Sequence, residues 1–184
     1  MFLKKIHLHA VAWSLTMLCG QVAAQSVHVP DSTLRPHIVH SINASGDDVY
    51  RDDRISTRPD TSLCLLYVGR KQNGALWLRL QVRYSSYKRL DMEKIEFRKG
   101  ERQLTINVMP QLYNYGDNGM ITWEWYDTPP SDPEMRVIRA IIREPEVSIT
   151  LYGRETITRL LSETERAAME NVLEQARILG RASE

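Results

Sequence analysis

The sequence is poor in cysteine, with two such residues, Cys19 and Cys64, in 184. Loss of the amino-terminal segment would leave Cys64 alone, and one cysteine cannot form an intrachain disulfide. Cys64 lies in the apolar run 62–69, where a free cysteine behaves as a small hydrophobic residue. A nucleophilic or interchain-bonding role is the alternative, but no neighbouring base in the sequence supports it.

Signatures of several common enzyme classes are also absent. The sequence contains no phosphate loop, no dinucleotide fingerprint, no G-x-S-x-G and no cysteine pair with zinc spacing. The formal net charge of +1 lacks the strong basic excess of most nucleic-acid-binding domains. We therefore expect no cofactor and no nucleic-acid partner.

The amino terminus has the order of segments found in secretory signal peptides. Lys4 and Lys5 precede an apolar run over 6–18, and small residues follow at 22–24. The run is shorter than the ~20 residues that span a bilayer, and no second one follows. We predict a cleaved signal peptide over 1–24 and export, with the periplasm favoured over secretion. A lipid anchor on Cys19 is less favoured, because a bulky leucine precedes that cysteine.

Residues 25–60 are polar, contain three prolines and lack a sustained period. This composition predicts a poorly ordered amino-terminal arm with a short strand at 37–42. Residues 61–184 are of a suitable length for a single globular domain.

Two hairpins are predicted in the first half of that domain. The β-rich runs 62–69 and 75–86 are separated by Asn73-Gly74, a strong hairpin signal. In the second run, Leu78, Leu80, Val82 and Tyr84 share one face, and Trp77, Arg79, Gln81 and Arg83 share the other. A second hairpin covers 92–109 and turns at Lys99-Gly100.

The stretch 119–132 raises the main question about a binding site. Ile121, Trp123 and Trp125 alternate with Thr122, Glu124 and Tyr126 along an extended chain. Because Ile121 shares the tryptophan side, we expect both tryptophans in the core and Glu124 and Tyr126 facing outward. The alternative is a platform of tryptophan rings for sugars or for side chains of a partner.

The carboxy-terminal half contains two helix starts. Ser131 precedes a proline and an acidic residue and predicts a short helix to about Arg143. Two strands follow over 146–161. A capping box at 162–165 begins a helix with one apolar face that ends near Gly180.

Hairpins followed by helices, without βαβ alternation, indicate an α+β fold. We predict a mostly antiparallel sheet of about six or seven strands, covered by the carboxy-terminal amphipathic helix and accompanied by one short helix. A β-sandwich with an appended helix is the alternative.

Charge is segregated along the chain. Residues 70–102 contain ten basic and four acidic residues, whereas 117–134 contain five acidic residues and no lysine or arginine. The two segments can steer a charged partner or an anionic surface, or they can neutralise each other across strands. The candidate contact residues are Glu124, Tyr126, Asp127, Arg79, Arg83, Arg98 and Lys99.

The sequence contains candidate residues for two further chemistries, metal binding and glycan hydrolysis. His37 and His40 lie near Asp47 and Asp48, and His28 precedes them, but no third ligand stands at a diagnostic spacing, so we predict no metal site. Glu124 and Asp127 are the acidic pair flanked by aromatic residues that a glycan hydrolase would need.

The leading hypothesis is an exported, bacterial, non-enzymatic protein-binding module, such as an envelope-complex subunit, an inhibitor or an immunity-type protein. Its partner would be another exported or envelope protein. The alternative is a cell-wall or glycan-binding protein, with Glu124 and Asp127 as the residues of a hydrolase.

Overall fold

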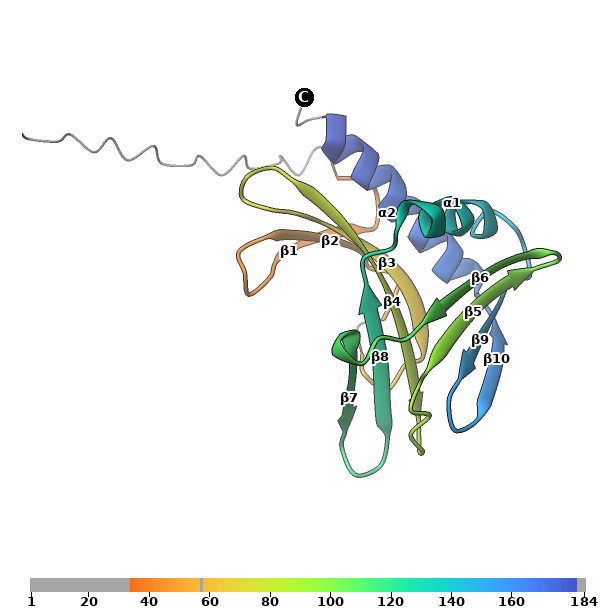
Figure 1. Cartoon of the computed structure of the whole chain (residues 1–184). Helices are drawn as coiled ribbons and strands as arrows, with labels where there is room; N and C mark the ends of the chain where they lie inside the picture. Colours follow the sequence, from red (N-terminus) through yellow and green to blue (C-terminus); the bar gives the residue numbers. More distant parts are fainter. Residues whose placement is uncertain (1–33, 57, 182–184) are drawn as a thin grey trace, which may run out of the picture.

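The computed structural model describes residues 34–56 and 58–181. The expected signal peptide, Cys19 and His28 lie outside the described residues. Figure 1 shows two sheets and two helices. Side chains from both sheets and both helices form one hydrophobic core. The predicted α+β class is confirmed, although ten antiparallel strands in two sheets replace the six or seven expected.

The larger sheet has six strands in the order β1-β2-β3-β4-β8-β7, all antiparallel. Both predicted strands around Asn73-Gly74 are present as β3 and β4. The strands are β1 (Ile38–Ile42), β2 (Asp48–Asp52), β3 (Leu63–Arg70), β4 (Leu76–Ser86), β7 (Tyr113–Asp117) and β8 (Thr122–Thr128).

The smaller sheet has four strands in the order β10-β9-β5-β6. Its central pair is β5 (Lys94–Lys99) and β9 (Ser148–Tyr152), with β6 (Arg102–Asn107) and β10 (Thr156–Leu160) at the edges. A short 3-10 turn, η2 (Pro110–Leu112), joins β6 to β7.

Both helices begin where the sequence predicts. In α1 (Asp132–Ile141), the Ser131 hydroxyl accepts from the Glu134 N–H and the Glu134 carboxylate accepts from the Ser131 N–H. In α2 (Glu163–Arg181), Ser162 and Glu165 form the same reciprocal pair at 2.8 and 3.1 Å. Such caps satisfy N–H groups that the first helical turn leaves free.

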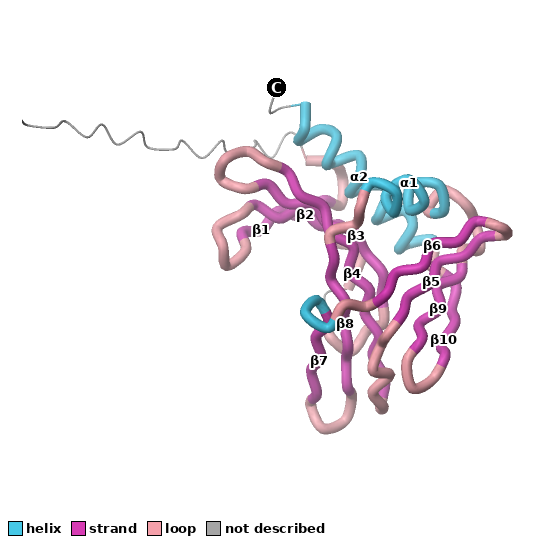
Figure 2. The backbone as a smooth tube through the Cα atoms, viewed as in Figure 1, coloured by secondary structure: helices cyan, strands magenta, loops and turns pink. Residues whose placement is uncertain are grey.

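Helix α2 packs against β2, β3 and β4, and α1 contacts β6 (Figure 2). The inner face of the six-stranded sheet, turned toward the helices, contributes Leu66 and Leu80 to the core. Phe97 comes from the smaller sheet, and Ile138 and Met169 come from α1 and α2. Burial of these side chains is the main stabilising contribution.

Residues 38–52 differ from the expected poorly ordered arm. The predicted short strand is present as β1, but β2 pairs with both β1 and β3. Val49 and Tyr50 are the apolar residues buried in β2. The third buried residue of the strand is Asp52, whose carboxylate accepts hydrogen bonds from Arg54 and Asn171. Alternation of apolar residues therefore could not reveal this strand.

Strand β7 carries no strand signal in its sequence YNYGD, which contains asparagine and glycine and no aliphatic residue. It pairs with β8 along its length and forms one edge of the larger sheet.

Among residues 34–56 and 58–181, no helix combines the length and the apolarity needed to cross a membrane.

Candidate functional site

Strand β8 has the opposite orientation to the one predicted. Glu124 and Tyr126 are buried, with 0% and 1% of their surface exposed, whereas Trp123, Trp125 and Asp127 are partly exposed. The expectation that the tryptophans occupy the core and that Glu124 and Tyr126 face outward is therefore wrong. Hydrogen bonds to Glu124 account for the difference.

The Glu124 carboxylate accepts three backbone hydrogen bonds from the segment that leads from β4 to β5. Its Oε1 accepts from the N–H of Leu90 at 2.6 Å and of Asp91 at 3.1 Å, and its Oε2 accepts from the N–H of Met92 at 3.1 Å. A buried carboxylate is tolerated when its oxygens are satisfied in this way. Glu124 therefore has a structural role and does not reach the surface.

Tyr126 also points inward, and its hydroxyl lies 3.5 Å from the Asn107 carbonyl oxygen. Nearby, burial and the Glu124 carboxylate raise the pKa of Tyr113 to about 12, although Arg89 opposes that rise. The larger sheet thus uses two of the expected contact residues for its own cohesion.

The opposite surface of this sheet, the outer face, consists of residues that the strand register places side by side. The pairs Tyr67↔Arg79, Gln81↔Asp127 and Arg83↔Trp125 bring β3, β4 and β8 together. We define the outer face by eight residues: Tyr67, Trp77, Arg79, Gln81, Arg83, Trp123, Trp125 and Asp127.

Asp127 is the centre of a polar cluster on the outer face. Its carboxylate accepts hydrogen bonds from the Tyr67 hydroxyl at 2.6 Å, from Gln81 Nε2 at 3.1 Å and from Arg79 Nε. Arg79 also donates from Nη2 to the Asp127 carbonyl oxygen at 2.6 Å. Charge-assisted bonds of this kind fix the geometry of both partners.

The ionisation behaviour of this cluster follows from its contacts. Burial would lower the pKa of Arg79, but the hydrogen bond and charge of Asp127 outweigh burial and raise it. Burial, together with Asp127, raises the pKa of Tyr67 well above its ordinary value. Arg79 therefore stays charged and Tyr67 stays neutral at physiological pH.

Two tryptophans of the outer face lie against glycines on neighbouring strands. Trp77 pairs with Gly69, and Trp123 pairs with Gly116. A Cβ at Gly116 would stand 2.5 Å from the Trp123 indole, and a Cβ at Gly69 would overlap Trp77. Packing of an aromatic ring over a cross-strand glycine is a recognised means of stabilising a sheet.

Further contacts hold the aromatic rings in place. Tyr67 and Trp77 pack edge to face with centroids 5.6 Å apart, and the Arg51 guanidinium lies 4.9 Å above the Tyr67 ring. The Trp77 indole N–H donates to Asp47 at 3.2 Å. The outer face therefore presents large rings in fixed orientations.

Arg83 joins this surface to the loop before β3. Its Nη1 donates to the Arg58 carbonyl oxygen at 2.6 Å, and its Nη2 lies 3.3 Å from Gln81 Oε1. Burial, followed by the charge of Arg51, lowers the pKa of Arg83. The cluster is thus rich in positive charge beside its single carboxylate.

The remaining predicted contact residues lie on the other sheet. Arg98 pairs with Glu96 at 2.9 Å, and Lys99 pairs with Glu146 at 3.4 Å. The structure therefore unites Arg79, Arg83 and Asp127 and separates them from Arg98 and Lys99. The Arg79–Asp127 bridge joins the basic and acidic segments across β4 and β8, as the neutralisation hypothesis expects.

Glu124 and Asp127 do not form a catalytic pair. They project from opposite faces of β8, and Glu124 is fully buried. Two carboxylates must flank one scissile bond in a glycosidase, and this arrangement cannot achieve that. The pair is therefore not available for hydrolysis.

The histidines and Cys64 have structural surroundings. His37 contacts Asp53 at 3.1 Å and His40 contacts Asp48 at 2.8 Å, and in the described part of the chain no three metal-ligating side chains gather. Cys64 is a buried free cysteine, and burial, with the charge of Glu165, raises the pKa of its thiol strongly. Such a thiol is unreactive.

Comparison with known proteins found no family model, no curated protein and no solved structure that matches this chain.

The sequence analysis did not identify Tyr67 as a member of the site. The sequence signal was the alternation of β4, which already placed Trp77 with Arg79 and Gln81 on the polar side. Facing residues on β3 share that side once the register is known.

Proposed function

We propose that this chain is an exported, bacterial, non-enzymatic protein-binding module that binds another exported or envelope protein through the outer face. An envelope-complex subunit, an inhibitor and an immunity-type protein all fit this description. The observation that carries the proposal is the cluster of partly exposed tryptophan and arginine side chains around Asp127, which the hydroxyl of the buried Tyr67 helps to hold in place.

The chemistry of this surface resembles that of binding hot spots. Tryptophan, tyrosine and arginine are the residue types that contribute most to protein interfaces. Here Trp77 and Trp123 are held against glycines, and Tyr67 is held by Asp127, before any partner arrives. Because these side chains are already ordered, a partner would lose little affinity to side-chain entropy.

Export to the periplasm is part of the same proposal and is supported by the basic, apolar and small-residue order of positions 4–24. A secreted or lipid-anchored form would expose the same surface to extracellular or envelope proteins.

The electrostatic part of the proposal can be tested by affinity capture. The tagged chain is incubated with its native envelope fraction at low and high salt, and the bound protein is identified by mass spectrometry. Arg83→Gln should weaken capture at low salt and reduce its dependence on salt, because a rim charge acts over the Debye length. Arg98→Gln, which changes a charge on the other sheet, is the matched control.

Thermal unfolding of both variants confirms that each remains folded at the capture temperature. If Arg83→Gln captures the same partner as the wild type with the same salt dependence, the electrostatic part of the proposal is wrong.

A glycan-binding role is a second candidate, favoured by the partly exposed position of Trp123 and Trp125. Stacking of sugar rings on tryptophan should shift or quench the fluorescence of these residues when peptidoglycan fragments or oligosaccharides are added. The response should be lost in the double variant Trp123→Phe/Trp125→Phe and kept in Trp77→Phe. Unchanged fluorescence of the wild type across the panel would eliminate this candidate.

A further inference from the structure

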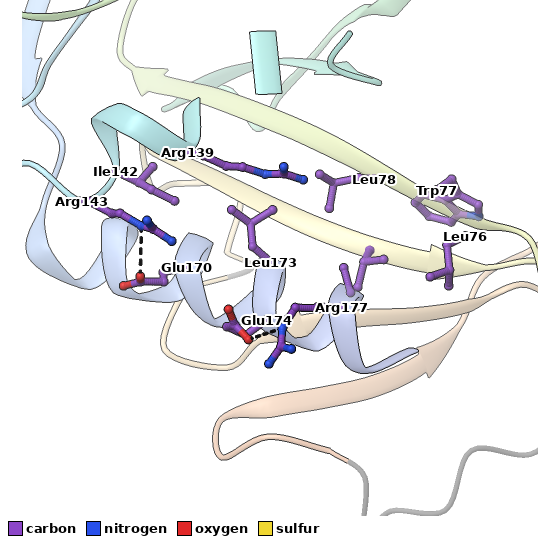
Figure 3. Close-up of a pocket in the computed structure, with 12 residues that line it drawn as sticks. Leu76, Trp77, Leu78, Arg139, Ile142, Arg143, Glu170, Leu173, Glu174 and Arg177 are labelled. Atoms are coloured by element: carbon purple, nitrogen blue, oxygen red, sulfur yellow. Dashed lines mark hydrogen bonds and ion pairs between the residues drawn. The ribbon is translucent and has the colours of Figure 1, made fainter. Parts of the chain in front are cut away.

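A separate cavity of about 590 Å³ lies between α1, α2 and the first half of β4 (Figure 3). Its apolar wall is formed by aliphatic side chains of β3, β4 and α2. Val68 is the buried member of this wall, whereas the other members are only partly buried. The wall residues are Val68, Leu76, Leu78, Leu173 and Ala176.

The segment after α1 and the end of α2 both lie close to the cavity. Ile142 follows α1 and lines the cavity beside that helix. Near the end of α2, the position of a Cβ on Gly180 would lie 3.8 Å from the Leu76 side chain. The result is a groove with an apolar wall, and its volume falls within the ~300–1,000 Å³ of small-molecule sites.

Charged side chains form the rim of this groove. Arg143 pairs with Glu170 at 3.6 Å, and Arg177 pairs with Glu174 at 2.9 Å. Arg139 also lines the groove, and over residues 34–56 and 58–181 it makes no ion pair. Figure 3 shows its guanidinium extending from α1 toward Leu78.

The rim therefore has one more positive than negative charge, and the excess lies beside the aliphatic wall. An anionic head group near Arg139 would gain a charge-assisted hydrogen bond, and an attached aliphatic chain would cover surface that water now reaches. An uncharged chain would gain the second contribution alone.

We propose that this groove binds a small amphiphile with an aliphatic chain and a single anionic head group, of which a fatty acid is the simplest example. The chain lies along Leu76, Leu78 and Leu173, and the head group contacts Arg139. The groove lies on the inner side of the larger sheet, and Trp77 is the single outer-face residue that also lines it. The site proposed here uses Arg139, Leu76, Leu78 and Leu173, none of which belongs to the outer face.

Isothermal titration calorimetry with laurate, below its micelle concentration, tests the proposal on the purified full chain. We expect saturable binding of one laurate and weaker binding of lauryl alcohol, which has the same chain without the charge. Arg139→Gln should weaken laurate binding about tenfold, as loss of one charged hydrogen bond predicts. Arg136→Gln, an exposed arginine of the same helix outside the groove, should not change it.

A second variant tests the apolar part of the site. Ala176→Phe places a ring in the groove and should abolish binding of both ligands, while thermal unfolding checks that the variant is folded. The proposal is overturned if laurate shows no saturable binding, or if Arg139→Gln and Ala176→Phe both bind it like the wild type. Equal binding of lauryl alcohol and laurate would overturn the assignment of an anionic ligand.

Discussion

Replacement of Glu124 by alanine should destabilise the protein more than most single substitutions. The change removes the acceptor for the N–H groups of Leu90, Asp91 and Met92, and the residues Leu90 and Met92 are almost fully buried. A buried donor without a partner costs about 1–3 kcal/mol. With partial relaxation of the segment, we expect the free energy of unfolding to fall by about 3–5 kcal/mol.

Urea unfolding followed by tryptophan fluorescence measures this change, provided that the slope with denaturant is the same in each variant. Glu124→Gln keeps one carbonyl oxygen but turns an amide toward one of the N–H donors, so we expect a smaller loss of about 1–2 kcal/mol. Glu93→Ala removes an exposed carboxylate from the same segment and should change stability by less than about 0.5 kcal/mol.

Comparison of Glu124→Ala with Glu93→Ala separates the loss of the buried hydrogen bonds from the effect of any substitution that disturbs residues 90–93. If Glu124→Ala costs no more than Glu93→Ala, then Glu124 does not hold residues 90–92 and the orientation assigned to β8 is wrong.

Three further predictions concern the rest of the fold. In a Cys19→Ser background, the Cys64 thiol should react with a disulfide reagent only after guanidinium unfolds the chain, because it is buried; rapid reaction of the native protein would contradict this. Gly116→Val should displace the Trp123 ring and shift its emission, and an unchanged spectrum and melting temperature would refute the packing. Burial would raise the pKa of Glu165, but its hydrogen bonds lower it overall; its stabilisation is therefore present above the unfolded value of about pH 4.3 and is lost as pH falls through the lower folded pKa. Unfolding between about pH 6 and 3 should thus depend less on pH in Glu165→Gln than in the wild type, and equal slopes would contradict the shift.

The sequence predicts the elements whose local signals agree with their final environment. Asn73-Gly74 marks the first hairpin, and the serine caps at Ser131 and Ser162 mark both helix starts. Strands β2 and β7 escape prediction because their apolar residues are few and their polar ones find partners across strands. Such compensation depends on tertiary contacts, which a periodic pattern does not record.

Sequence patterns predict only part of the candidate site, because tertiary contacts decide the rest. Alternation correctly grouped Arg79 and Arg83 on one face of β4, but it reversed the two faces of β8. From the sequence alone, a glutamate such as Glu124 is assigned to the surface, although here its carboxylate is buried and accepts three backbone hydrogen bonds. A tryptophan such as Trp123 is assigned to the core, although here its ring lies over a glycine on a partly exposed face. Two partners decide the matter. Gly116 faces Trp123 only through the β7–β8 pairing, and Leu90, in the segment before β5, is distant from Glu124 in the chain.

The central claim is that the outer face binds a protein partner through its aromatic side chains. The most direct test compares capture from the native envelope fraction by the wild type, by the double variant Trp123→Ala/Trp125→Ala, and by Tyr87→Ala. Tyr87 is an exposed aromatic residue outside the outer face and serves as the control. We predict one stoichiometric protein that the wild type and Tyr87→Ala retain and the folded double variant loses. Retention of that protein by the double variant, or no captured protein with the wild type, would contradict the account.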